Sequence, residues 1–412
     1  MTITSWKGFY FSLMPFGWAL QAAGHQVRVA CAPTEAGTVG AAGLVPLPVL
    51  QPFPAMQSER VARVERWAAD GRFDGPEELR PLHPVTREPM AHPGEFDIAV
   101  DGRRFWDDCV RVIGYNCDAA VGFARTWQPD LVLHDPLAIE GAIAARVVGA
   151  PSVYVTPGGF GAVDGPPEQD GDVSFDDPSG ACVRHGVRPW DRSQITHVLD
   201  PTPDAVPIPL GEATRLRVRH VPYNGIGEAA ESVLPPADRP RVCLIWSGLV
   251  TEVYGNRAPI LRRAVTAITA TGAELVVLAP GPEALALLGE LPADARVLYQ
   301  YPLQMALSQC DVLVNSGSIN SLMTASTMGV PQLVLPLAND QVEMAARFAK
   351  TGAVRIVSGI DGTTEQVKDS LERLLSGSSH REAARRVAEE NERRPSPALL
   401  VPELERLAAQ HK

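Results

Sequence analysis

The segment from Cys310 to Gln341 constrains the fold of this chain more than any other segment does. An apolar strand leads into the small-residue turn NSGS at positions 315–318, and a helix runs from this turn to Met328. Gly329 and a proline soon after it end the helix, and a second apolar strand follows. Such a unit points a helix N-terminus out of the carboxyl end of a sheet. Free backbone N–H groups and the helix dipole favour an anion there, such as a diphosphate.

Short apolar strands alternate with helices over residues 1–50 and again over residues 242–356. This alternation is typical of a parallel sheet covered by helices on both faces. A chain of 412 residues is too long for one ordinary core, so two domains of about 200 residues each are expected. We therefore predict an α/β fold with two doubly wound, Rossmann-like domains that face a central cleft, with ligands at the strand ends along it.

The proline-rich stretch 200–240 is the expected domain junction. We place the domains at 1–215 and 216–392, followed by a C-terminal helix at 393–412 that packs back on the N-terminal domain. A short first strand is expected at Thr2–Trp6. This leaves little chain for a full strand and suggests that a few residues are missing from the start of the recorded reading frame.

Two stretches of the N-terminal half lack a strong pattern. Residues 51–105 are rich in Pro, Arg and Glu and are expected to be irregular. Residues 158–180 are rich in Gly, Pro and Asp, a composition that cannot pack a core, and are expected to form a mobile loop.

Composition argues against several classes of partner. The net charge of −11 argues against nucleic acid, because phosphate binding needs clustered Lys and Arg. No apolar run reaches the roughly 18 residues of a transmembrane helix, so no membrane segment is predicted.

The six cysteines are scattered, with neither a CxxC pair nor metal-ligand spacing. This favours free thiols in a reducing cytosol and no metal site.

Four segments together resemble one enzyme family. They are PFGWALQAAGHQVRVA at 15–30, VRHVPYNG at 218–225, DRPRVCL at 238–244 and the segment 310–341. Nearly the whole chain resembles the GT-B glycosyltransferases that attach nucleotide-activated deoxysugars to polyketide antibiotics. The resemblance implies a cytoplasmic, inverting enzyme that takes a dTDP-deoxysugar as co-substrate and a polyketide aglycone as acceptor, and that needs no metal or other cofactor. It also implies that the N-terminal domain binds the acceptor and the C-terminal domain binds the nucleotide sugar.

The donor site implied by this resemblance surrounds the turn at 315–318. Backbone N–H groups of the turn are expected to bind the diphosphate, although a tight turn also needs small residues for its own geometry. Asp340 and Gln341 match the family pair that binds sugar hydroxyls, and Asp340 also suits a helix N-cap. Residues 247 and 248 follow a strand and are either phosphate contacts or an ordinary loop. The expected donor-binding residues are Ser247, Gly248, Asn315, Gly317, Ser318, Ile319, Asn320, Asp340 and Gln341.

Two positions depart from the family pattern. The family holds the diphosphate with a histidine where this chain has Asn315, which donates a hydrogen bond but carries no charge. The family also carries a histidine base at the position of Phe9, which cannot accept a proton. Asp135 and His134, which follow a strand, are the best remaining candidates for catalytic acid–base groups, and a simple turn at Asp135 is the alternative.

The missing base leaves both the bond type and the activity open. C-glycosyltransferases of angucycline biosynthesis also lack this histidine, and residues 250–262 and 397–408 are similar to that branch. An ionised phenol is nucleophilic at a ring carbon, so formation of a C-glycoside is one hypothesis. The alternative is a catalytically silent GT-B protein that binds nucleotide or aglycone, or that assists a partner glycosyltransferase.

Aromatic side chains of the N-terminal half are candidates to line the acceptor pocket, although core packing is the default role for aromatic residues. The expected acceptor-binding residues are Phe9, Trp67, Trp106 and Phe160. A homodimer or a helper protein is compatible with the sequence, which identifies neither the sugar nor the aglycone.

Overall fold

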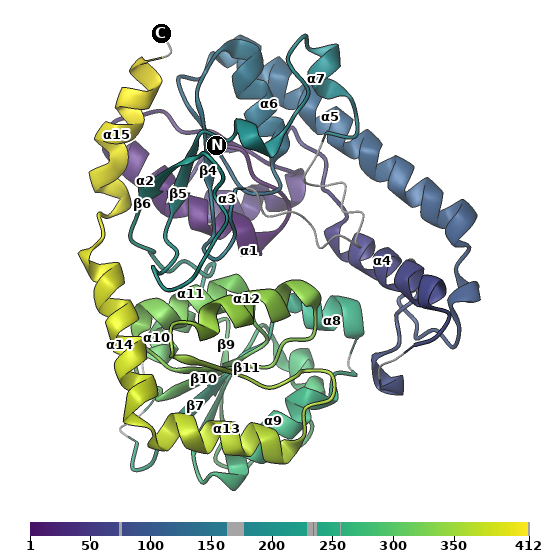
Figure 1. Ribbon diagram of the computed structural model, residues 1–412, viewed down its shortest axis with the longest axis vertical. Coiled ribbons are helices and arrows are strands. Elements are labelled where there is room, and N and C mark those ends of the chain that lie inside the picture. Colours follow the sequence, from purple (N-terminus) through teal and green to yellow (C-terminus); the bar gives the residue numbers. More distant parts are fainter. Residues whose placement is uncertain (74–75, 163–176, 229–233, 235–236, 256, 411–412) are drawn as a thin grey trace.

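Two α/β lobes stack one on the other, each built on a parallel sheet (Figure 1). The protein is represented by a computed structural model, which describes residues 1–73, 76–162, 177–228, 234, 237–255 and 257–410. Strands β1 to β6 form the sheet of the N-terminal lobe, and β7 to β12 form that of the C-terminal lobe. The α/β class with two parallel sheets is the class that the sequence predicts.

The N-terminal sheet is joined through a single residue. Thr2 forms parallel bridges with Ala30 and with His134, which gives the order β2-β1-Thr2-β3-β4-β5-β6. In chain order this is a doubly wound sheet whose direction of winding reverses between Thr2 and β3. Its strands are β1 (Val29–Ala30), β2 (Pro46–Leu47), β3 (Val132–His134), β4 (Ser152–Val155), β5 (His197–Asp200) and β6 (Thr214–Arg217). The α-helices of this lobe are α1 (Lys7–Tyr10), α2 (Met14–Ala22), α3 (Ala36–Ala41), α4 (Ala55–Asp70), α5 (Arg103–Trp127), α6 (Ile139–Val148) and α7 (Ala181–Arg184).

The C-terminal sheet has the strand order of a dinucleotide-binding fold. Its strands are all parallel, in the order β12-β11-β10-β7-β8-β9, so the winding reverses between β7 and β10. Every residue of β8 is buried, as expected of an apolar strand covered on both faces. The strands are β7 (Arg241–Leu244), β8 (Glu274–Ala279), β9 (Arg296–Tyr299), β10 (Val312–Asn315), β11 (Gln332–Val334) and β12 (Val354–Ile356). The helices are α8 (Gly248–Tyr254), α9 (Pro259–Ala270), α10 (Leu303–Leu307), α11 (Ile319–Met328), α12 (Asn339–Ala349), α13 (Thr364–Ser376), α14 (Ser378–Arg393) and α15 (Pro397–Ala409).

The last helix returns to the N-terminal lobe. Leu404 and Leu407 of α15 are buried in the same hydrophobic cluster as Phe16 of α2. In Figure 1, α14 lies beside the lower lobe and α15 continues along the upper one. Strand β6 crosses position 215, where the sequence places the end of the first domain. The division of the chain at 215 and 392 stays a prediction.

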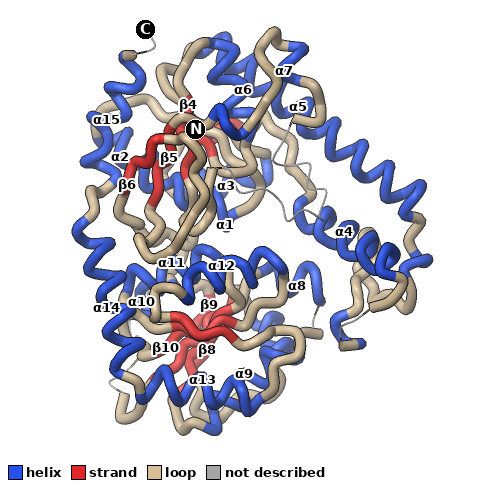
Figure 2. Tube along the Cα trace, viewed as in Figure 1, coloured by secondary structure: helices blue, strands red, loops and turns tan. Residues whose placement is uncertain are grey.

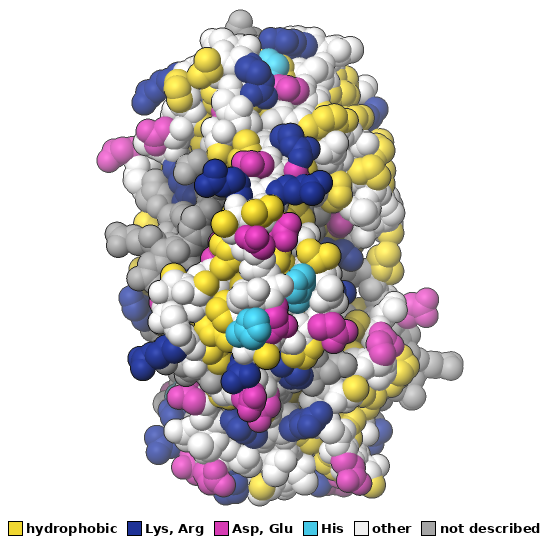
Figure 3. Space-filling model, turned by 90° about the vertical axis from the view of Figure 1, so that its right-hand side faces the viewer, with side chains coloured by type: hydrophobic (Ala, Val, Ile, Leu, Met, Phe, Trp, Pro, Cys, Tyr) yellow, Lys and Arg dark blue, Asp and Glu magenta, His cyan; other side chains and the backbone are white. Residues whose placement is uncertain are grey.

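A helical arm built from α4 and α5 reaches from the N-terminal lobe toward the C-terminal lobe (Figure 2). The Arg60 Nη1 donates to the backbone oxygen of Glu252 at 2.9 Å, and the Arg63 Nη1 donates to the Tyr254 hydroxyl oxygen at 2.8 Å. These bonds join α4 to α8. On the face that carries the arm, basic and acidic side chains are interspersed among hydrophobic ones (Figure 3).

The expectation of irregular structure over residues 51–105 is wrong, because α4 occupies 16 of these residues. Its buried side chains include Val61, Val64 and Trp67 but also Arg60, so the apolar stripe is narrow and interrupted. The strand expected at Thr2–Trp6 forms only the bridges of Thr2.

The segment predicted to be a mobile loop, 158–180, is packed where it begins. Gly158 and Gly159 are buried, and the Arg347 Nη1 of α12 donates to the backbone oxygen of Gly159 at 2.7 Å. Residues 163–176 of this segment lie outside the described residues. No helix in the described part of the chain is long and apolar enough to cross a membrane.

Candidate active site

The turns that follow β7 and β10 meet where the winding of the C-terminal sheet reverses. The backbone N–H of Ser247, after β7, donates to the Oγ of Ser316, after β10, at 3.1 Å. The Ser247 Oγ is itself buried and has no hydrogen-bond partner among the described residues. In open parallel sheets, ligands bind at this reversal point, outside the carboxyl ends of the strands.

Asn315 shapes the turn from within. It is 2% exposed, its Oδ1 accepts from the backbone N–H of Gly317 at 2.8 Å, and its Nδ2 donates to Gln332 Oε1 at 3.2 Å. Gln332 is fully buried in β11 and also donates to the backbone oxygen of Leu322 at 3.1 Å. Both ends of the Asn315 amide are therefore engaged inside the lobe, and its expected contact with the diphosphate stays a prediction.

The N-terminus of α11 presents a row of free backbone donors. Among the described residues, the N–H groups of Ser318, Ile319 and Asn320 have no hydrogen-bond acceptor, whereas the Ser318 side chain caps the N–H of Ser321. These N–H groups lie at the positive end of a ten-residue helix, an arrangement that favours an anion.

Gly317 brings the two halves of the expected donor motif together. Its φ is +87°, and a Cβ placed on it would lie 3.1 Å from Val334 Cγ1 and 3.3 Å from Gln341 Cβ. The turn thus needs glycine both for its left-handed backbone and for its close approach to α12.

Asp340 and Gln341 lie in the first turn of α12, one exposed and the other buried. Gln341 is 4% exposed, and its Oε1 accepts from the backbone N–H groups of Leu337 at 3.0 Å and Ala338 at 3.4 Å. Asp340 is exposed, and its charge contributes to the raised pKa of Tyr254 on α8, after the larger effect of burial. Their expected contacts with sugar hydroxyls stay predictions, and Gly248 is exposed at the start of α8.

Asp135 is buried, and its carboxylate links the N-terminal segment to the start of α6. Its Oδ2 accepts from the Thr4 backbone N–H at 2.7 Å and the Thr4 Oγ1 at 3.0 Å, and its Oδ1 accepts from Leu137 N at 2.9 Å and Ala138 N at 3.0 Å. Burial raises the pKa of Asp135 to about 6 against the opposing effect of these hydrogen bonds. Burial also lowers the pKa of His134 to about 4.

These contacts give Asp135 the turn-forming role that the sequence leaves as an alternative, and an acid–base role for Asp135 and His134 stays a prediction. Neither residue lines the cavity that lies nearby in this lobe.

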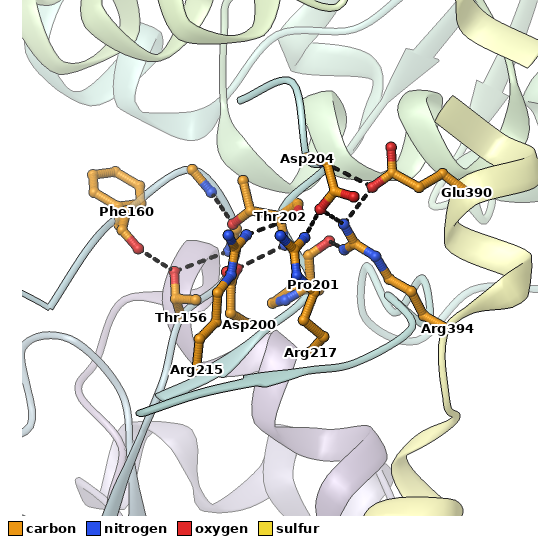
Figure 4. Close-up of polar contacts among 12 residues, drawn as sticks. Thr156, Phe160, Asp200, Pro201, Thr202, Asp204, Arg215, Arg217, Glu390 and Arg394 are labelled. Atoms are coloured by element: carbon orange, nitrogen blue, oxygen red, sulfur yellow. Dashed lines mark hydrogen bonds and ion pairs between the residues drawn. The ribbon is translucent and has the colours of Figure 1, made fainter. Parts of the chain in front are cut away.

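The expected acceptor residues fall into two separate pairs. The rings of Phe9 and Phe160 are 5.2 Å apart and nearly perpendicular, and Phe160 packs against the α11 and α12 cluster of the other lobe. The Thr156 hydroxyl donates to the Phe160 backbone oxygen at 2.7 Å and so fixes this loop (Figure 4). Trp67 and Trp106 instead belong to a hydrophobic cluster of the arm. An acceptor role for all four residues stays a prediction.

Glu140 and Gln332 are absent from the sequence-based set of candidates. Glu140, in the first turn of α6, is 6% exposed and lines a cavity beside the N-terminal segment. Each is a polar residue in a mainly apolar element, which is the signal that the sequence offers for both. Among the described residues, no group of His, Cys, Asp and Glu is arranged to hold a metal ion.

Comparison with known proteins identifies the family. Residues 18–247 match the N-terminal domain, and residues 262–407 match the C-terminal domain, of the erythromycin biosynthesis protein CIII-like family. This chain belongs to the CIII-like glycosyltransferase family. The resemblance drawn from the sequence is confirmed at this level.

Two relatives align with the chain along its length. A 10-deoxymethynolide desosaminyltransferase of Streptomyces venezuelae is 31% identical over 421 residues, which cover 98% of this chain and 95% of that protein. An aklavinone 7-beta-L-rhodosaminyltransferase of Streptomyces galilaeus is 31% identical over 438 residues, which cover 97% of this chain and 93% of that protein.

Solved structures share the fold. The spinosyn forosaminyltransferase SpnP matches with a TM-score of 0.74 and 27% identity, covering 99% of this chain and 98% of that one. The glycosyltransferase VinC in complex with dTDP matches with a TM-score of 0.73 and 26% identity over 100% of both chains. This CIII-like protein is therefore a GT-B deoxysugar glycosyltransferase of antibiotic biosynthesis, as the sequence predicts.

Proposed function

We propose that the protein transfers a deoxysugar from a dTDP-sugar to a polyketide-type aglycone, with inversion at the sugar carbon. The observation that carries this proposal is the row of free N–H groups at the N-terminus of α11, at the reversal point of the C-terminal sheet. Relatives named for 10-deoxymethynolide and aklavinone, and neighbours bound to thymidine diphosphate, support the choice of substrates.

Whether the product is an O-glycoside or a C-glycoside depends on how the acceptor loses its proton. Phe9 stands where the family carries a histidine base, and it packs edge-to-face on Phe160, so this position takes no proton. This observation supports C-transfer to an ionised phenol as a second candidate beside O-transfer. A C-glycoside resists acid hydrolysis, whereas an O-glycoside releases its sugar. Acid treatment of the product followed by mass spectrometry therefore decides between them.

Donor binding and transfer are tested on the purified full chain. At 100 times its dissociation constant, dTDP should stabilise the protein by about 2.7 kcal/mol, and ADP at the same concentration should stabilise it less. Incubation of a TDP-deoxysugar with aklavinone or 10-deoxymethynolide should give a mass increase equal to one sugar. Binding of dTDP without transfer to any acceptor would favour the silent GT-B protein, and no thermal shift at millimolar dTDP would refute the donor site.

We expect the enzyme to act in the cytoplasm, because all six of its cysteines are free and five are buried. A homodimer or a helper protein stays a prediction. Gel filtration of the active preparation tests the first, and activity of the purified chain alone tests the second.

A further inference from the structure

A buried carboxyl group lies beside the reversal point of the N-terminal sheet. Glu140 is in the first turn of α6, directly after β3, and lines a cavity together with residues that follow the other strand ends, among them Thr4, Ala32 and Gln51. This is the place in a doubly wound sheet where ligands bind. The turn at 315–318, hereafter the donor turn, occupies the equivalent place in the other lobe.

The walls of this cavity are held firmly. Asp135 ties Thr4 to the start of α6 through four hydrogen bonds from backbone and hydroxyl donors. Asn116 of α5 clamps the opposite wall, since its Oδ1 accepts from Gln51 N at 2.7 Å and its Nδ2 donates to Gln51 O at 3.0 Å. These hydrogen bonds fix the backbone around the Glu140 carboxyl.

Glu140 has no counter-charge. It is the only ionisable side chain among the described residues that line the cavity, and its carboxyl has no donor among them other than its own backbone N–H. The titratable groups that interact with it are Asp135 from the β3–α6 loop and Cys117 from α5, and neither supplies a positive charge. Burial keeps His134, at the end of β3, neutral at neutral pH. Burial, and then the charge of Asp135, raise the pKa of Glu140 to about 8.

One side chain that lines the cavity also contacts the other lobe. Trp6 lines the cavity and packs against the hydrophobic core of the C-terminal lobe. The cavity has a volume of about 30 Å³, which holds one or two water molecules or the hydroxyl-bearing edge of a larger molecule. A polar group that occupies this cavity would therefore lie beside Glu140.

We propose that Glu140 is a catalytic residue that accepts the proton of an acceptor hydroxyl during sugar transfer. The hydroxyl O–H bond breaks and its proton passes to the Glu140 carboxylate. The freed electron pair of the acceptor attacks the sugar C1, either directly from oxygen or through the ring carbon of a phenol. The bond from C1 to the diphosphate oxygen breaks, and dTDP leaves with the electron pair of that bond. After attack by a ring carbon, the proton on that carbon moves to the phenol oxygen, which restores the aromatic ring. This role rests on the proposed glycosyl transfer.

Glu140 fits this role better than the other candidates of the lobe. Phe9 cannot accept a proton. The oxygens of Asp135 are occupied by four donors, and Asp135 is fully buried and outside the cavity lining. Asp135 instead acts as a positioning residue that holds the first turn of α6. A carboxyl that is protonated below about pH 8 and ionised above it suits removal of a hydroxyl proton in mildly alkaline conditions.

Glu140→Gln in the full chain tests the proposal, with aklavinone and a TDP-deoxysugar as substrates. The substitution keeps the shape of the side chain but removes the proton acceptor, so kcat/KM should fall about 10²- to 10⁴-fold. Affinity for dTDP, measured by calorimetry, should change less than about twofold because the donor turn is in the other lobe. Glu35→Gln is the matched control: Glu35 is a buried carboxyl that accepts from Tyr10 at 2.5 Å and does not line the cavity.

The pH profile gives an independent readout. Wild-type kcat/KM should rise about tenfold per pH unit up to about pH 8 and then level off, and Glu140→Gln should lose this rise. Glu140→Asp should keep it at a lower rate, and this variant decides the matter if Glu140→Gln fails to fold. Wild-type activity and an unchanged profile in Glu140→Gln would overturn the role of Glu140 alone. A wild-type protein that binds no dTDP and transfers no sugar would overturn the proposed function itself.

Discussion

At the scale of single residues, the donor turn shows what an uncharged side chain does in place of a histidine. The Asn315 amide is hydrogen-bonded to Gly317 and to the buried Gln332, so it fixes the path of the turn instead of facing solvent. The proposed diphosphate site then consists of backbone N–H groups, whose direction is set by the turn. Such a site is sensitive to backbone geometry more than to side-chain charge.

Gly317→Ala should weaken dTDP binding about tenfold or more. A Cβ at φ +87° strains the backbone and meets Val334 and Gln341 at 3.1–3.3 Å, so the turn must shift away from α12. Gly329→Ala, at φ +69° on the other end of α11, is the control, because its Cβ meets only ordinary contacts from 3.4 Å. Both variants should lose stability, and only Gly317→Ala should lose affinity in calorimetry. Equal affinities would place the nucleotide elsewhere.

His220 should make the protein sensitive to acid. It is 8% exposed, its Nε2 has no partner among the described residues, and burial lowers its pKa from 6.5 to about 4. Below pH 6.5 the His220 imidazole is protonated in the unfolded chain, whereas in the folded chain it stays neutral down to about pH 4. The stability contributed by neutral His220 is therefore present above pH 6.5 and is lost as the pH falls toward 4. The full loss corresponds to about 3 kcal/mol.

His220→Gln should flatten the fall in the free energy of unfolding between pH 6.5 and 4, measured by urea titration. His92→Gln, at a side chain that is 69% exposed, is the control and should leave the slope of wild type unchanged. A slope in His220→Gln as steep as that of wild type would assign the acid sensitivity to other groups, such as the buried His134.

At the scale of elements, the sequence predicts those segments whose pattern comes from local burial. The strands of the C-terminal sheet are apolar runs bounded by helices with clear ends, and the unit around 315–318 appears where it is expected. Strands β5 and β6 escape prediction because their sequences, HVLD and TRLR, carry charges. Some of those charges are neutralised only when the two strands pair, as Arg215 of β6 does with Asp200 of β5.

The helix α4 escapes prediction for the same physical reason. Part of its buried face is made of arginines, and their partners lie in the other lobe, about 190 residues away in sequence. The sequence does not single out acceptor residues, because aromatic composition does not tell a pocket from a core. Trp67 and Trp106 are packed together in the arm, whereas Glu140 becomes noticeable only when the cavity around it is known.

Arg63→Ala should loosen the contact between α4 and α8. The Arg63 guanidinium lies 4.2 Å from the centre of the Tyr254 ring, and it donates to the Tyr254 hydroxyl and to the Leu79 backbone oxygen. Loss of these contacts should lower the free energy of unfolding by about 1–3 kcal/mol. Arg104→Ala, at an exposed position of α5, should change it by less than about 0.5 kcal/mol. Equal effects in urea titration would mean that the arm does not hold the lobes together.

At the scale of the whole molecule, both candidate sites lie where a doubly wound sheet reverses, and the lobes are joined by contacts that surround them. The loop at 156–161 rests on α11 and α12, the arm rests on α8, and the junction of α14 and α15 rests on the loop after β5. The relative placement of donor and acceptor therefore depends on residues that touch neither. Figure 4 shows the most highly charged of these contacts.

Arg394 is the centre of that contact. Its side chain is 7% exposed, its Nη1 donates to the Pro201 backbone oxygen at 2.7 Å, and its Nη2 donates to Asp204 Oδ1 at 3.1 Å and to Glu390. Asp204 is also paired with Arg217 at the end of β6 (Figure 4). A single guanidinium thus joins Glu390 of α14, which packs on the C-terminal lobe, to the loop after β5 of the N-terminal lobe.

Arg394→Ala should lower the free energy of unfolding by about 2 kcal/mol, because it removes a buried charge and leaves the Pro201 carbonyl without its donor. The loss stays below the full cost of a broken buried pair, since Asp204 is 57% exposed and can turn to water. Arg393→Ala is the matched control one residue earlier: its side chain is 73% exposed and pairs with Glu389 at 3.3 Å, so its loss should cost less than about 1 kcal/mol. Sugar transfer should fall further in Arg394→Ala than affinity for dTDP does, because dTDP needs one lobe and transfer needs both. A variant that loses neither stability nor transfer would show that the lobes are held in place by the arm and the 156–161 loop alone.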